Sequence, residues 1–192
     1  MEFSLRELID VVEAWPPAAV VGLLFGGAFL EYIFPPVPGD AVVLAGAVLV
    51  GAAGWSAWLV FGVVTLGSAL GAAAAFGVGR WLERSGRLAR LSEKKRAGID
   101  DVVARFERRG AFYLAINRFF PGIRAFFFVA AGLAGYRLRV VLLWSVVSAL
   151  LWNAMLMGAG VFLGHNVDEI DTFFTRYTWV MWGLIAAVVV VV

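Results

Sequence analysis

Cysteine is absent from the 192-residue chain, and His165 is its single histidine. Disulfides, thiolate metal sites and cysteine nucleophiles are therefore excluded, while the redox compartment stays open. The chain also has no HExxH, P-loop or Asp-rich metal motif, and no GxSxG motif with His and Asp partners. We therefore expect no enzyme activity, no catalytic residue, no cofactor and no metal, and we interpret His165 as an anchor at a membrane edge.

Charged residues are scarce as well. They form 16% of the chain, hydrophobic residues form 62%, and the mean hydropathy is +0.88. Soluble domains are about half apolar and about a quarter charged, so this composition predicts an integral membrane protein. No polar linker divides residues 1–192, which indicates a single domain. Residues 2–13 have acids opposite a helical apolar stripe, which predicts an amphipathic surface helix instead of a signal peptide.

Two apolar stretches are interrupted by proline and glycine. Residues 18–53 are long enough to cross a bilayer, but Pro35, Pro36, Pro38 and Gly39 break the helix. We expect a re-entrant hairpin that descends over 18–33 and returns over 40–53. Residues 111–136 repeat the pattern around Pro121 and Gly122.

Three uninterrupted apolar segments, residues 55–81, 140–164 and 172–192, predict spanning helices. The expected fold is thus an all-α polytopic membrane protein with two opposed re-entrant hairpins, about three spans and amphipathic surface helices. Paired interrupted segments indicate a transporter site at the bilayer midplane, although the residues of the two halves match poorly.

The segment 80–109 is rich in Lys and Arg, and a helical stripe of Ile99, Val102, Val103 and Phe106 suggests a helix ending at Gly110. Positively charged loops face the cytoplasm, so we expect this segment and the C-terminus to be cytoplasmic. The first hairpin then opens from outside and the second from inside. The segment serves either as a solvated linker or as a binding surface for anionic headgroups.

Four ionisable residues fall within the interrupted hairpins: Glu31, Asp40, Arg118 and Arg124. Such residues normally pair or line a wet cavity, because each costs a few kcal/mol or more inside a bilayer. Simpler explanations exist for three of them. Asp40 suits an N-cap, Glu31 suits a counter-ion to an arginine, and Arg118 suits the end of a half-helix.

Arg124 is harder to explain locally. It follows Pro121-Gly122 at the expected N-terminus of a half-helix, where a cation is unfavourable. A cation beside open backbone N–H groups forms an anion site, and the second hairpin has no acid at its break. We therefore expect an external anion, with phosphate as the first candidate, and Arg118 close enough to share it.

The motif FLEYIFPPVPGD (residues 29–40) with Leu44-Ala-Gly46, and RFFPGIR (residues 118–124) with Ala131-Gly132, resemble the paired motifs of the DedA family. This family is also described as having the SNARE-associated or VTT domain. Trp152 and Gly164 continue the resemblance, which covers about residues 20–165. Relatives often have Asp and Tyr where this chain has Ala72 and Phe76, so a polar contribution from that helix is in doubt.

The resemblance implies a multi-pass lipid transporter of the bacterial inner membrane. It implies undecaprenyl phosphate or phosphatidylethanolamine as the flipped lipid, with dependence on the proton gradient. Arg118 and Arg124 would bind the lipid phosphate, and Glu31 and Asp40 would be proton acceptors or counter-ions. The alternatives are an ion- or proton-coupled transporter of a small solute and a membrane-homeostasis protein without transport. Membrane lipids are the expected partners, nucleic acid is not, and a homo-oligomer is compatible with the sequence.

Overall fold

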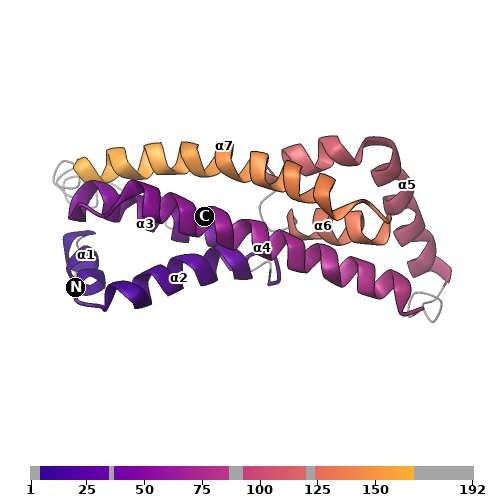
Figure 1. Cartoon of the computed structure of the whole chain (residues 1–192), viewed down its shortest axis with the longest axis horizontal. Helices are drawn as coiled ribbons and strands as arrows, with labels where there is room; N and C mark the ends of the chain where they lie inside the picture. Colours follow the sequence, from indigo (N-terminus) through magenta and orange to yellow (C-terminus); the bar gives the residue numbers. More distant parts are fainter. Residues whose placement is uncertain (1–4, 35–36, 87–92, 120–123, 167–192) are drawn as a thin grey trace, which may run out of the picture.

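The computed structural model describes residues 5–34, 37–86, 93–119 and 124–166, and every regular element in these ranges is helical. Figure 1 shows an elongated bundle in which α4 and α7 run along the long axis. The elements are α1 (Leu5–Glu13), α2 (Pro17–Leu30), α3 (Gly39–Ala53), α4 (Ala57–Arg84), α5 (Glu93–Ile116), the 3-10 turn η2 (Asn117–Phe119), α6 (Arg124–Leu133) and α7 (Leu138–His165). The prediction of an all-helical chain is confirmed for the described residues.

The first interrupted stretch forms two short helices. α2 has Pro17 in its first turn, where the missing N–H is not needed, and ends at Leu30. α3 begins at Gly39, directly after Pro38, and ends at Gly54, whose φ of 69° is the left-handed conformation that suits a helix end. With 14 and 15 residues, the two helices are each only about 22 Å long. Pro35 and Pro36 lie outside the described residues.

Within the described part of the chain, two helices are both long enough and apolar enough to cross a membrane. α4 and α7 have 28 residues each, about 42 Å, and among the described residues they alone combine sufficient length with sufficient hydropathy. They correspond to the predicted spans 55–81 and 140–164. The third predicted span, residues 172–192, lies outside the described residues, as do Pro121 and Gly122.

The helix end predicted at Gly110 coincides with a break in α5. Non-helical backbone at Arg109, with φ and ψ of −142° and 24°, separates two helical segments within Glu93–Ile116. Gly110 is buried, and a Cβ there would collide with the ring of Tyr136 and with Phe106. The Tyr136 hydroxyl also donates a hydrogen bond of 2.9 Å to the Phe106 carbonyl oxygen. Glycine at this position therefore allows close packing directly after the break at Arg109.

The helices pack in a pattern that repeats between the two halves of the chain. α2 packs on α4, as α5 packs on α7. The returning half-helix of each hairpin packs on the long helix of the other half, α3 on α7 and α6 on α4. In Figure 1, α2 and α3 lie in one half of the long axis and α6 in the other. The two halves match poorly in sequence, but their helices pack in the same pattern. The internal repeat is thus present in the packing.

Two glycine pairs set the closest helix contacts. A Cβ on Gly79 or on Gly132 would collide with the backbone of the opposite helix, α6 or α4 respectively. Gly51 of α3 and Gly164 of α7 form an equivalent pair. Small residues allow such backbone contact, which is typical of helix packing within membranes.

Two apolar clusters fill the bundle on either side of its middle. Tyr32 and Phe128 belong to one, together with Leu114 of α5. Val20 and Val43 belong to the other, and Ile9 and Val12 of α1 pack against it. The predicted amphipathic helix therefore places part of its apolar face against the bundle.

We expect Gly132→Ala to destabilise the protein by about 1–3 kcal/mol, because the added methyl group forces α4 and α6 apart. Gly77→Ala is the matched control, since a Cβ at this α4 position meets no atom within 4 Å. The control should be neutral or stabilising by up to about 1 kcal/mol, the usual helical preference for alanine. Unfolding in mixed detergent and SDS micelles measures both changes. Equal stability of the two variants would show that the contact tolerates a methyl group.

Candidate functional site

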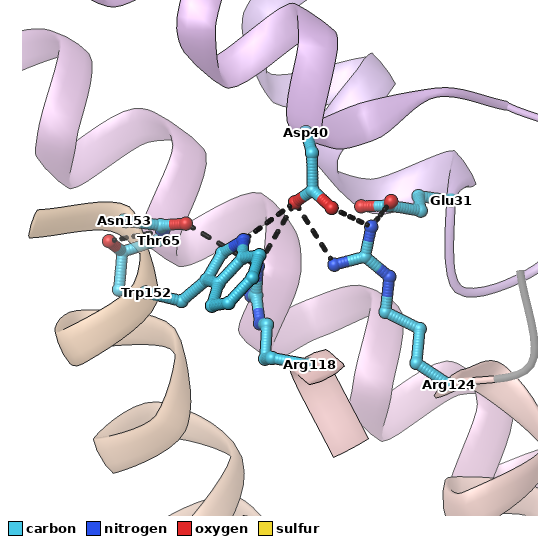
Figure 2. A network of polar contacts seen from close by, with 7 residues as sticks. All are labelled: Glu31, Asp40, Thr65, Arg118, Arg124, Trp152 and Asn153. Carbon is cyan, nitrogen blue, oxygen red and sulfur yellow. Dashed lines mark hydrogen bonds and ion pairs between the residues drawn. The ribbon is translucent and has the colours of Figure 1, made fainter. Parts of the chain in front are cut away.

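The four ionisable residues predicted from sequence come together in one cluster, which Figure 2 shows. Glu31 follows the last residue of α2, and Asp40 lies in the first turn of α3. Arg118 belongs to η2, and Arg124 begins α6. Glu31, Arg118 and Arg124 are only 6%, 2% and 1% exposed, so three of the four charges are buried.

Arg124 is held by both acids of the first hairpin. Its Nη1 and Nη2 donate to Asp40 Oδ1 and Oδ2 at 3.2 and 2.9 Å, a bidentate arrangement, and Nη2 also forms an ion pair with Glu31 Oε1. The first hairpin thus supplies two carboxylates that balance Arg124, and the external anion expected from the sequence stays a prediction. The interpretation of Glu31 as a counter-ion to an arginine is confirmed.

Asp40 does not cap α3. The N-cap residue is Pro38, and no side chain caps the helix. The Asp40 carboxylate instead accepts hydrogen bonds from Arg124 and, at 3.0 Å, from Trp152 Nε1. Its place in the first turn still favours a negative charge through the helix dipole. The N-cap explanation is thus replaced by a tertiary contact with α6 and α7.

Gly39 allows this arrangement. A Cβ at Gly39 would overlap the side chain of Glu31, including its carboxylate. The glycine after the proline therefore does more than break the helix, because it leaves room for an acid against the start of α3.

Arg118 connects the acids to the two long helices. Its Nη1 lies 3.8 Å from Asp40 Oδ1 and donates to Asn153 Oδ1 at 3.4 Å. Asn153 Nδ2 donates in turn to Thr65 Oγ1 at 3.1 Å. A polar chain thus runs from α4 through α7 to η2 and α3, as Figure 2 shows.

Tyr32 lies close to both arginines. The guanidinium carbons of Arg118 and Arg124 are 5.8 and 5.7 Å from its ring centroid, within the range of cation–π attraction. The tyrosine is 2% exposed. An aromatic ring near two cations contributes attraction to each without adding another charge.

Four residues of the cluster were missed as site residues from sequence: Tyr32, Thr65, Trp152 and Asn153. Tyr32 and Trp152 are within the stretches that carry the family resemblance, so they could have been included. Asn153 was detectable as an amide within an apolar span, where polar side chains often bond across helices. Thr65 had no distinguishing signal.

Ala72 and Phe76 are buried in the apolar cluster that contains Tyr32. These two positions of α4 therefore contribute packing and no polar group. Ser68, one turn earlier on α4, is 1% exposed and lies beside the hydroxyl of Tyr32. Within the described ranges, no three His, Cys, Asp or Glu residues are grouped so that they could hold a metal.

Comparison with known proteins identifies relatives over most of the chain. The family model described as the VTT domain matches residues 37–162. A Lactococcus lactis subsp. cremoris protein named alkaline phosphatase-like protein is 32% identical over 177 residues, covering 85% of this chain and 81% of that protein. An uncharacterized membrane protein of Synechocystis sp. is 28% identical, covering 92% and 81%. Inner membrane protein YghB of Salmonella typhimurium is 26% identical, covering 91% and 85%. No solved structure matches the chain.

We expect strong energetic coupling between Glu31 and Arg124. Arg124→Gln should destabilise the protein by about 3–5 kcal/mol, because it leaves buried carboxylates without their cation. Adding Glu31→Gln should cost little more, which gives a coupling energy of about 1.5–3 kcal/mol in a double-mutant cycle. Reversible unfolding in mixed micelles measures each step.

The exposed pair Arg80–Glu83, at 3.4 Å and with side chains 28% and 43% exposed, is the control for this cycle. Its coupling should stay below about 0.5 kcal/mol. Similar coupling energies for the two pairs would contradict a special role of burial in the central cluster.

Proposed function

The chain belongs to the VTT-domain family of membrane proteins, also called the DedA family, and from this premise we propose that it transports a phosphate-bearing lipid across the bilayer. Undecaprenyl phosphate and phosphatidylethanolamine are the two candidate lipids. The observation that carries the proposal is the buried cluster in which the first hairpin supplies two acids and the second supplies two arginines.

The cluster provides the charge that a lipid headgroup needs within an apolar environment. Guanidinium groups bind phosphate through two parallel N–H donors. Both arginines lie at the break of the second hairpin, Arg118 in η2 and Arg124 at the start of α6. A headgroup that reaches the middle of the bundle would therefore exchange its hydration for these donors. The acyl or prenyl chains would stay in the lipid around α4 and α7.

We further propose that both hairpins are re-entrant and enter from opposite faces. α2, α3 and α6 are too short to cross about 30 Å of hydrocarbon. With the basic segment and the C-terminus in the cytoplasm, the first hairpin opens outward and the second inward. The bacterial inner membrane is the proposed location, and the name of the Salmonella relative supports it.

We propose that transport is coupled to protons because the lipid phosphate competes with the two acids for the arginines. In the structure Arg124 neutralises Glu31 and Asp40. A lipid phosphate that draws Arg124 away would leave a carboxylate without its cation in an apolar site, where the protonated form is the more stable one. Uptake of a proton with the lipid, and its release with the lipid, would connect transport to a proton gradient.

We propose that no chemical step accompanies transport. Because a Lactococcus relative is named alkaline phosphatase-like protein, the test of function includes a measurement of released inorganic phosphate. Lipid movement without phosphate release supports a transporter, whereas release from a phosphomonoester lipid would support a hydrolase instead.

Glu31→Gln and Asp40→Asn should keep lipid binding and lose the response to a pH gradient, because each amide imitates a permanently protonated acid. In proteoliposomes with a fluorescent polyprenyl phosphate or phosphatidylethanolamine, we expect gradient-driven transport to fall at least about tenfold, equivalent to about 1.4 kcal/mol. The exposed Glu83→Gln is the matched control and should respond like the parent. A full gradient response in both amide variants would exclude both acids as the coupling site.

Cysteine accessibility tests the topology, because the chain has no native thiol. A membrane-impermeant maleimide should label Ala18→Cys and Ser56→Cys from the same outer face, since both flank the first hairpin and are exposed. Phe112→Cys and Leu138→Cys should label only from the cytoplasmic face, as should the control Glu83→Cys. Labelling of positions 18 and 56 from opposite faces would show that residues 18–53 span the membrane.

A further inference from the structure

Arg118 has one hydrogen-bonding edge that its neighbours do not use. Its Nη1 donates to Asn153 and approaches Asp40. Its Nε and Nη2 are buried and have no hydrogen-bond partner among the described residues. In a guanidinium group the Nε–H and one Nη2–H point in the same direction, at a spacing that matches two oxygens of a phosphate. The unused edge is therefore a bidentate donor.

Two hydroxyl groups flank this arginine. The hydroxyl of Tyr32 lies beside Arg118 and beside Ser68 of α4. Ser68 Oγ is also buried without a hydrogen-bond partner in the described part of the chain. The arginine and both hydroxyl-bearing residues are at most 2% exposed. Buried donors normally find partners, so several unsatisfied donors at one place indicate a polar ligand.

Arg124 also has a buried Nε without a hydrogen-bond partner among the described residues, but it has no free bidentate edge. Both of its terminal nitrogens are engaged by the carboxylates of Asp40 and Glu31. A phosphate that binds Arg124 through these nitrogens must first displace an acid. A phosphate that binds Arg118 through Nε and Nη2 displaces no carboxylate, because both acids are held by other nitrogens.

We propose that the Nε–Nη2 edge of Arg118, with the hydroxyls of Tyr32 and Ser68, is the subsite that first binds the phosphate group. Asn153 and Thr65 are positioning residues, because their hydrogen-bonded pair holds Nη1 and so directs the opposite edge toward the hydroxyls. Arg124 acts afterwards, when the bound anion competes for it with the two acids. This assignment rests on the proposed function, and it separates the roles of the two arginines.

The test is binding of two probes, inorganic phosphate and dihexanoyl phosphatidic acid, to the full chain in lipid nanodiscs by isothermal titration. Arg118→Lys keeps the charge but loses the bidentate edge, so its Kd should rise at least about tenfold for the phosphatidic acid. Arg124→Lys should bind it within about threefold of the parent and yet lose transport. Ser68→Ala and Tyr32→Phe should each weaken binding about two- to tenfold, the usual effect of losing one hydrogen bond.

The positioning role has its own readout. Thr65→Val removes the hydroxyl that holds Asn153 and should weaken phosphate binding several-fold, whereas Thr65→Ser should restore it. Ser145→Ala is the matched control for a buried hydroxyl, because Ser145 lies eight residues, about 12 Å, along α7 from Asn153. Unfolding midpoints close to that of the parent exclude loss of folding as the cause.

The outcomes distinguish the phosphate subsite at Arg118 from the proposed lipid transport. Equal weakening by Arg118→Lys and Arg124→Lys, or unchanged binding in Arg118→Lys, overturns the subsite even where the parent transports lipid. Arg118-dependent binding of the phosphatidic acid in a parent that moves no lipid supports the subsite and overturns the transporter. Arg118-dependent binding of inorganic phosphate alone supports the subsite and assigns it to the free anion. Binding of neither probe by the parent overturns the subsite.

Discussion

The guanidinium group of Arg124 is the interaction on which the middle of this protein depends. It contacts Asp40 across 84 residues of sequence and Glu31 across a still longer separation, and so joins the two hairpins. A buried guanidinium without carboxylates, or two buried carboxylates without a cation, would each be strongly unfavourable in this apolar bundle. The positions of α2, α3 and α6 are therefore interdependent. Each contributes one charged residue, and the cluster is unfavourable when any of these charges is missing.

Around this cluster, the bundle consists of two halves with the same plan. Each half has a broken pair of helices followed by one long helix, and the returning half-helix of each pair packs on the long helix of the other. The glycine pairs Gly79–Gly132 and Gly51–Gly164 occupy equivalent places in these two contacts. The acids and arginines of the central cluster lie between these two glycine contacts. The two halves thus share one packing pattern but contribute different charges to the cluster, acids from the first half and arginines from the second.

Local signals predicted the elements well, and tertiary contacts account for the differences. Pro38 and Gly39 excluded a continuous helix, and apolar length located α4 and α7. Gly110 correctly marks the break in α5 at Arg109, but the sequence does not show that the ring of Tyr136 packs against this glycine. Asp40 matched the N-cap pattern, yet its partners come from α6 and α7. The link from Thr65 to Asn153 depends on the register of two long helices, which periodicity within one helix cannot specify.

The division of charge between the halves has a consequence for biosynthesis. Glu31 and Asp40 leave the ribosome about 80 residues before Arg118 and Arg124. During this interval the first hairpin has neither of the cations that neutralise it in the finished protein. Its acids must then stay at the membrane surface or stay protonated, because an unpaired carboxylate is costly in hydrocarbon. Truncation before residue 118 would therefore leave Glu31 and Asp40 without the arginines that pair with them in the full chain.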